Sequence, residues 1–160
     1  MLTDDHTGPH RFSLPAWISC APYEQLLGIK ILRAEGGEAL LEMPFHQSLA
    51  QGAGLMHGGA LVSLADTAVV MAIKSIIAPG THFATISLES RFLRPVKQGI
   101  VRAKAFVSAH GEARFNGQCD ILDEDDRTVM TFTSVFKIAR DERIRNVRFD
   151  DRPPQPPPDH

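Results

Sequence analysis

The pattern of apolar and polar positions divides this chain into one long helix and a series of strands. The stretch 51–80 opens with glycines, continues as a nearly unbroken apolar run and stops at Pro79-Gly80. We expect a helix from Gly58 to about Ile77, roughly five turns at 3.6 residues per turn. Because its residues are apolar on almost every side, the pattern predicts a buried helix rather than one on a surface.

The segments on either side of this helix carry strand patterns. Before it, 29–34 and 38–43 flank Gly36-Gly37, which indicates a hairpin. After Gly80 the apolar residues alternate, and this pattern predicts strands at 81–93, 101–107, 115–121 and 129–138. In the first of these, one buried face is expected to carry Ala84, Ile86, Leu88 and Phe92.

A shorter helix is expected near the N-terminus, and a tail near the C-terminus. Within 14–27, Trp17, Ile18, Tyr23, Leu26 and Leu27 form the apolar side of the expected helix, and Gly28 ends it. Residues 1–13 read as a loose lead-in, 14–140 as one domain, and 141–160 as a charged, proline-rich tail that cannot form a core. The order of elements predicts an α+β fold, a strongly curved antiparallel β-sheet wrapped around one long central α-helix.

The composition of the chain argues against nucleic-acid, membrane and metal partners. The 160 residues suit one domain, and a formal net charge of -2 gives no global attraction to nucleic acid. The longest apolar run contains Lys74 and is too short to span a membrane, and the first residues do not form a secretory signal. Cys20 and Cys119 suggest neither a disulfide nor a metal site, which favours a reducing, cytoplasmic location. The scattered histidines predict no metal.

Asp66 is the first candidate for chemistry. A carboxylate on a buried helix costs free energy unless it is paired or used. Ser63 and Lys74 share its stripe of the helix, so Asp66 is either a general base or a structural acid that they satisfy. Gly58 has two readings as well, because a helix start offers unpaired N–H donors to a developing oxyanion, whereas glycines there also allow tight packing.

Three sequence motifs carry a family resemblance. The lead-in YEQLLGIKI, the helix opening HGGALVSLAD and the later FLRP resemble the hotdog-fold acyl-CoA thioesterases, most closely their phenylacetate-pathway (PaaI-like) branch. The resemblance covers roughly residues 22–138. It implies the hotdog fold, hydrolysis of an acyl-CoA to a carboxylic acid and CoA, no bound cofactor, and a homodimer or homotetramer with active sites shared between chains.

The resemblance also assigns roles to particular residues. It implies that the Gly58 N–H polarises the thioester carbonyl and that Asp66 acts as base or nucleophile. Gln51 would orient water or the carbonyl, and His57 is expected to fix the loop by hydrogen bonding. Possible substrate contacts are Gly59, Thr85, Arg91 and Arg94, with the two arginines as candidates for the CoA phosphates, although such residues are usually only solvated.

Two rival functions remain open at this point. A hotdog dehydratase or hydratase would change a double bond without releasing thiol, and its helix-entry motif differs from HGGALVSLAD. A non-catalytic acyl-CoA-binding regulator would show no turnover and usually carries a DNA-binding segment, of which the sequence shows no pattern.

Overall fold

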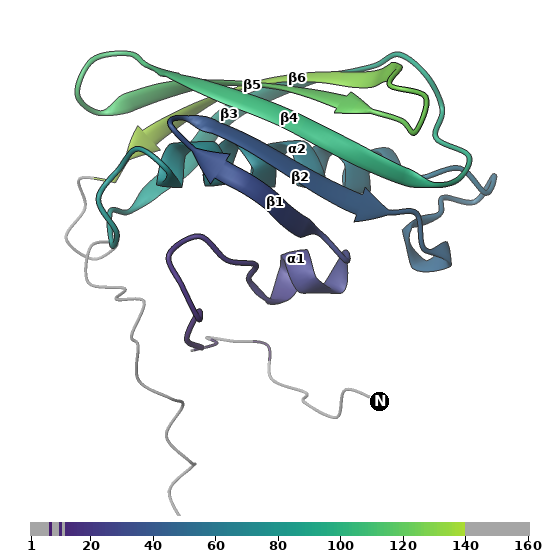
Figure 1. Cartoon of the computed structure of the whole chain (residues 1–160), viewed down its shortest axis with the longest axis horizontal. Coiled ribbons are helices and arrows are strands. Elements are labelled where there is room, and N and C mark those ends of the chain that lie inside the picture. The colour runs from purple at the N-terminus through teal and green to yellow at the C-terminus, as the bar shows by residue number, and fades with distance from the viewer. Residues whose placement is uncertain (1–6, 8–9, 11, 140–160) are drawn as a thin grey trace, which may run out of the picture.

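The computed structural model describes residues 7, 10 and 12–139. The expected tail, 141–160, and most of the lead-in therefore lie outside the described residues. The described chain is a six-stranded antiparallel sheet that curves around one long helix, so the predicted α+β hotdog architecture is confirmed (Figure 1). None of the described helices is long and apolar enough to cross a membrane.

The sheet does not follow the order of the chain. Along the sequence the elements are α1 (Pro22–Leu26), β1 (Lys30–Glu35), β2 (Glu38–Pro44), a 3-10 turn (Gln47–Leu49), α2 (Gly58–Lys74), β3 (Phe83–Phe92), β4 (Ile100–Ala109), β5 (Arg114–Leu122) and β6 (Thr128–Ile138). In the sheet the order is β1-β2-β4-β5-β6-β3. The strand that directly follows α2 therefore lies at one edge, beside the last strand.

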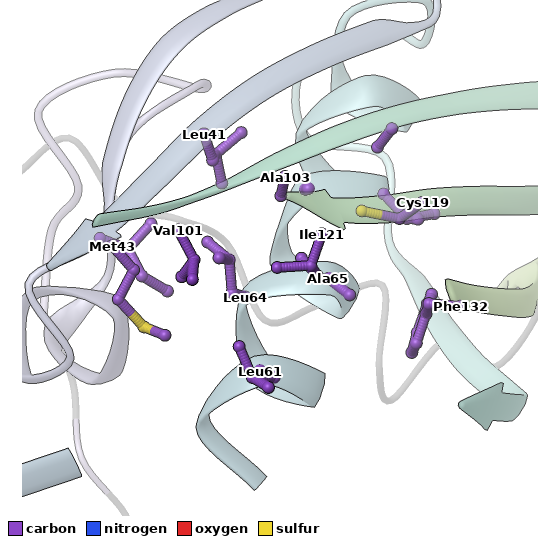
Figure 2. Close-up of a cluster of buried hydrophobic side chains, with 14 of the residues drawn as sticks. Leu41, Met43, Leu61, Leu64, Ala65, Val101, Ala103, Cys119, Ile121 and Phe132 are labelled. Carbon is purple, nitrogen blue, oxygen red and sulfur yellow. The ribbon is translucent and has the colours of Figure 1, made fainter. Parts of the chain in front are cut away.

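The core lies between α2 and the inner face of the sheet. Figure 2 shows side chains from α2 meeting those of β2, β4, β5 and β6, among them Leu41, Met43, Leu61, Leu64, Ala65, Val101, Ala103, Cys119, Ile121 and Phe132. The closest approach is at Gly117 of β5. A methyl group there would overlap Val69 Cγ1 of α2 and lie 2.8 Å from Ser134 Oγ. Glycine thus lets the helix press directly against the middle of the sheet.

Both helix predictions were wrong in their extent. The N-terminal helix is only the five residues of α1, which starts with proline at its first turn and buries no residue. The chain before α1 is bent rather than helical, and Ser19 Oγ donates to Ala16 O there. The long helix ends at Lys74, three residues earlier than expected. Ser75 stops it, because its hydroxyl donates to Ala72 O and accepts the N–H of Gly37 in the β1–β2 turn.

Strand β3 also differs from its prediction as a half-buried strand. A bulge between Thr85 and Ser87 leaves Ile86 without a partner residue on β6. Ile86, Leu88 and Phe92 are 54%, 47% and 56% exposed. The reason is that β3 is the edge strand beside β6: α2 packs mainly on the other strands, and the outer edge of β3 has no partner strand within the described chain. A long, apolar, unpaired edge is a surface on which another strand can add.

Candidate active site

Asp66 lies where α2 meets β3. Thr85 Oγ1 donates a hydrogen bond of 3.1 Å to Asp66 Oδ1. Burial raises the pKa of the Asp66 carboxyl above its ordinary value, and the hydrogen bond from Thr85 lowers it in part. A carboxyl group held in this way is suited to accept a proton, because its ionised form is less stabilised than it would be in water.

The residues expected to satisfy a purely structural Asp66 are occupied elsewhere. Ser63 Oγ donates to Gly59 O at 2.8 Å and shares a 2.7 Å hydrogen bond with the hydroxyl of Tyr23. Lys74 Nζ donates to Trp17 O at 3.0 Å. Thr85 is therefore the one described side chain that hydrogen-bonds to Asp66, and no cation neutralises this acid within the described chain.

The first turn of α2 leaves one backbone donor open. His57 is the N-cap residue, and its Nδ1 accepts the Gly59 N–H at 2.8 Å. The next N–H groups, those of Ala60 and Leu61, point to His57 O. Among the described residues none accepts a hydrogen bond from the Gly58 N–H. The open donor thus belongs to Gly58, at the positive end of the helix dipole, whereas that of Gly59 is engaged.

Phe92 is a candidate site residue that the sequence analysis missed. A Cβ built on Gly58 would lie 3.0 Å from Phe92 Cε1 and 3.1 Å from Cζ, so the ring lies directly over this glycine. Strand β3 therefore touches α2 at two of the candidate residues, through Thr85 at Asp66 and through Phe92 at Gly58. In the sequence Phe92 was only one more apolar residue of a strand, because no local pattern shows which helix residue it covers.

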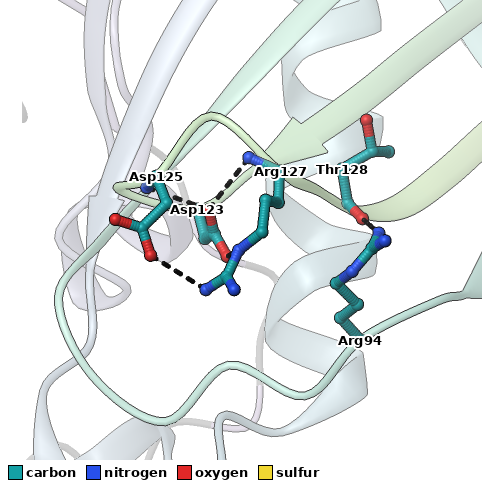
Figure 3. A network of polar contacts seen from close by, with 5 residues as sticks. All are labelled: Arg94, Asp123, Asp125, Arg127 and Thr128. Carbon is teal, nitrogen blue, oxygen red and sulfur yellow. Dashed lines mark hydrogen bonds and ion pairs between the residues drawn. The ribbon is translucent and has the colours of Figure 1, made fainter.

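Three further predicted residues make other contacts. Gln51 Oε1 accepts the N–H of Ala53 inside its own turn, so its side chain is folded back on the loop. Arg91 Nε pairs with Glu89 at 3.2 Å. Arg94 Nη1 donates to Thr128 O at 2.8 Å, as Figure 3 shows. None of the three hydrogen-bonds to Asp66, Thr85 or Gly58.

The surroundings of Arg94 include several acids. Arg127 pairs there with Asp123 at 3.0 Å and with Asp125 at 2.9 Å in the β5–β6 turn (Figure 3). Loss of solvation raises the pKa of the Asp123 carboxyl, but the hydrogen bonds from Arg127 and Asp125 and the charge of Arg127 outweigh it and hold this pKa below its ordinary value. These acids oppose the binding of a phosphate next to Arg94.

Comparison with known proteins identifies the family. The model of the thioesterase superfamily matches residues 53–130. The putative esterase ComA2 of Bacillus subtilis is 32% identical over 107 residues, which cover 66% of this chain and 84% of that protein. The chain belongs to the thioesterase superfamily. The proofreading thioesterase EntH of Klebsiella pneumoniae agrees, with 32% identity over 105 residues, 66% of this chain and 77% of that protein.

Solved structures support the same branch of this superfamily. The PaaI protein of the E. coli phenylacetic acid degradation operon superimposes with a TM-score of 0.69 at 28% identity, covering 74% of this chain and 85% of that one. The thioesterase HI1161 of Haemophilus influenzae gives 0.69 at 26% identity, covering 73% and 82%. The resemblance to PaaI-like hotdog thioesterases is therefore confirmed, and the protein is a thioester hydrolase.

Proposed function

We propose that this thioesterase hydrolyses an acyl-CoA, with Asp66 as its base or nucleophile. The observation that carries the proposal is the hydrogen bond between Thr85 of β3 and Asp66, the one acidic residue of α2. Burial raises the pKa of the Asp66 carboxyl, the Thr85 hydrogen bond lowers it in part, and the Thr85 hydroxyl also fixes the orientation of the carboxyl. Asp66 either takes a proton from the attacking water or attacks the carbonyl carbon itself.

The Gly58 N–H supplies the other half of the reaction. Attack on a thioester carbonyl places negative charge on its oxygen, and a preorganised N–H donor stabilises that charge. The hydrogen bond from Gly59 to His57 keeps the loop in place before the helix and leaves the Gly58 donor for substrate. In the proposed mechanism His57 therefore has a positioning role, and the carbonyl oxygen of the substrate approaches the Gly58 N–H beside the Phe92 ring, which packs against this glycine.

The two groups cannot act together within one chain. Gly58 and Asp66 are eight residues apart, about 12 Å along the helix at ~1.5 Å per residue. Both must lie within ~3 Å of one reacting centre. Two antiparallel helices related by a two-fold axis would bring Gly58 of one chain to Asp66 of the other. The open β3 edge, with Ile86, Leu88 and Phe92 exposed, is the surface on which we expect the two sheets to join.

The central test is thiol release from a panel of aryl-, short- and long-chain acyl-CoAs. Asp66→Asn keeps the shape of the side chain and removes the base, so kcat should fall about 10²-fold or more. The matched control is Asp120→Asn, an exposed position on β5, which should keep wild-type kcat. A folded Asp66→Asn enzyme with near-normal kcat would exclude the proposed role.

Complementation tests the shared site. Gly58→Val blocks the oxyanion donor, and the exposed Phe92 ring can move aside to accept the new side chain, so the fold should persist. Equal amounts of Gly58→Val and Asp66→Asn are refolded together. Half of the dimers are then mixed, each with one intact site, and about a quarter of wild-type activity should return. Proven subunit exchange without recovery would refute the shared site, as would a fully active monomer.

A further inference from the structure

The segment from Trp17 into the first turn of α1 is attached to α2 at both of its ends. At one end, Trp17 Nε1 donates to Lys74 O and Lys74 Nζ donates to Trp17 O, each at 3.0 Å. The ammonium also lies 4.7 Å from the centroid of the Trp17 ring, a cation–π contact. At the other end, the Tyr23 hydroxyl bonds to Ser63 at 2.7 Å. Residues 17–23 are therefore a strap that is fixed to the helix at two points.

The two points lie on the stripe of α2 that carries the catalytic acid. Ser63, Asp66, Val70 and Lys74 follow one another at steps of three and four, so they share one face of the helix. The anchors at positions 63 and 74 are about 16 Å apart along the axis at ~1.5 Å per residue. Because Trp17 meets Lys74 and Tyr23 meets Ser63, the strap runs antiparallel to α2 along the length of helix that contains Val70 and Asp66.

Tyr23 is the residue of this strap that comes nearest to Asp66 along the helix. Its hydrogen-bond partner, Ser63, lies one turn before Asp66, and residues three apart on a helix have Cβ atoms about 5–6 Å apart. Because the Ser63 proton goes to Gly59 O, the Tyr23 hydroxyl is the donor to Ser63. The bond fixes the ring, yet 55% of Tyr23 remains exposed. A fixed aromatic ring with an open face beside a catalytic carboxyl is suited to contact substrate.

We propose that the strap 17–23 forms a wall of the acyl-binding pocket and that Tyr23 is a specificity-determining residue that limits the size of the acyl group. The inference rests on the proposed acyl-CoA hydrolysis at Asp66. On this arrangement the acyl group leaves the reacting carbonyl along Val70, between α2 and the strap, and the Trp17–Lys74 pair closes the far end. The site therefore takes an apolar acyl group of restricted bulk.

The test measures kcat/KM for a bulky aryl-acyl-CoA and for acetyl-CoA in the same enzyme. Tyr23→Ala removes the ring and should raise the ratio of bulky to small substrate about tenfold or more, the scale of a changed apolar pocket contact. Tyr23→Trp should lower this ratio. Tyr23→Phe and Ser63→Ala both delete the Tyr23–Ser63 hydrogen bond, so both should have smaller effects in the same direction that do not add in the double variant.

Leu26→Ala is the matched control. Leu26 is another exposed apolar residue of α1, 73% exposed, and its aliphatic side chain has no polar group with which to bind α2. It should leave the ratio unchanged. If the wild type is active, the proposed pocket wall would be refuted by an unchanged substrate ratio in Tyr23→Ala and Tyr23→Trp. It would also be refuted if Leu26→Ala changed the ratio as much as they do. A wild type that releases no thiol from any acyl-CoA would overturn the proposed function itself, and the wall with it.

Discussion

The close approach at Gly117 allows a quantitative prediction for Gly117→Ala. The new methyl group would overlap Val69 Cγ1 and lie 3.0 Å from Val69 Cγ2 and 2.8 Å from Ser134 Oγ. All of these neighbours are in the core, so none can move into solvent. The backbone of Gly117 is not left-handed, and the change therefore perturbs packing and not the conformation of the chain.

Two effects set the size of the loss. Extra carbon in a filled core destabilises by about 1–3 kcal/mol. Replacing glycine with alanine returns about 0.4–1 kcal/mol by restricting the unfolded chain. The free energy of unfolding should therefore fall by roughly 1–2 kcal/mol, and Tm by about 2–8 °C for a chain of this size. Urea unfolding followed by circular dichroism measures both the loss and the m-value.

A second variant isolates the helix contact. Val69→Ala removes the atoms that the new methyl group would meet, so the double variant should lose about 1 kcal/mol less than the sum of the two single changes. Gly52→Ala is the control, because no atom lies within 4 Å of its added Cβ, and it should be nearly neutral. If Gly117→Ala is as stable as the wild type, or if its loss is strictly additive with that of Val69→Ala, the reasoning is refuted.

Two further predictions concern protonation. Thr85→Val removes the hydrogen bond that lowers the Asp66 pKa, so the acid limb of the pH profile of kcat/KM should move to higher pH. The control, Thr133→Val on the outer face of the sheet, should leave this limb in place. An unmoved limb in Thr85→Val would exclude Asp66 as the titrating base. Burial lowers the pKa of the Lys74 ammonium, and the nearby charge of Glu24 offsets part of this shift. Between the lowered pKa and the ordinary value of about 10.4, the folded state therefore binds fewer protons than the unfolded state. The free energy of unfolding should rise with pH across this window, and chemical unfolding at several pH values should show a smaller rise in Lys74→Met. An identical dependence on pH in the two proteins would contradict this prediction.

The features that were predicted correctly are those that local sequence encodes. The Gly36-Gly37 turn between two apolar segments fixes the first hairpin, and both glycines have positive φ. The long apolar run fixes α2 and isolates Asp66 within it. The wrong predictions depend on distant partners. The exposure of β3 follows from its position beside β6, and Tyr23 meets Ser63 across 40 residues of sequence. No periodicity within either segment contains that information.

The candidate site residue Gln51 also shows that local sequence does not determine which groups a side chain contacts. Its position in the chain matches a family site residue, but the tight turn that follows it offers the N–H of Ala53 as a nearer partner. Conversely, the value of Thr85 in the candidate site comes from the bulge after it, which keeps its side chain on the helix side of β3. A bulge in an edge strand leaves little trace in the sequence, because it changes pairing without requiring a particular residue type.

The strand order has a consequence for how the protein is made. On the ribosome α2 and β3 emerge before β4, β5 and β6, yet β2 must wait for β4 and β3 must wait for β6, whose last residue is Ile138. The most apolar helix of the chain is therefore synthesised well before most of the sheet that buries it. Non-local pairing of this kind slows folding and exposes apolar surface to aggregation. Nascent chains that stop short of β6 should depend on chaperones, and a truncation before Thr128 should accumulate as aggregate rather than as a smaller folded domain.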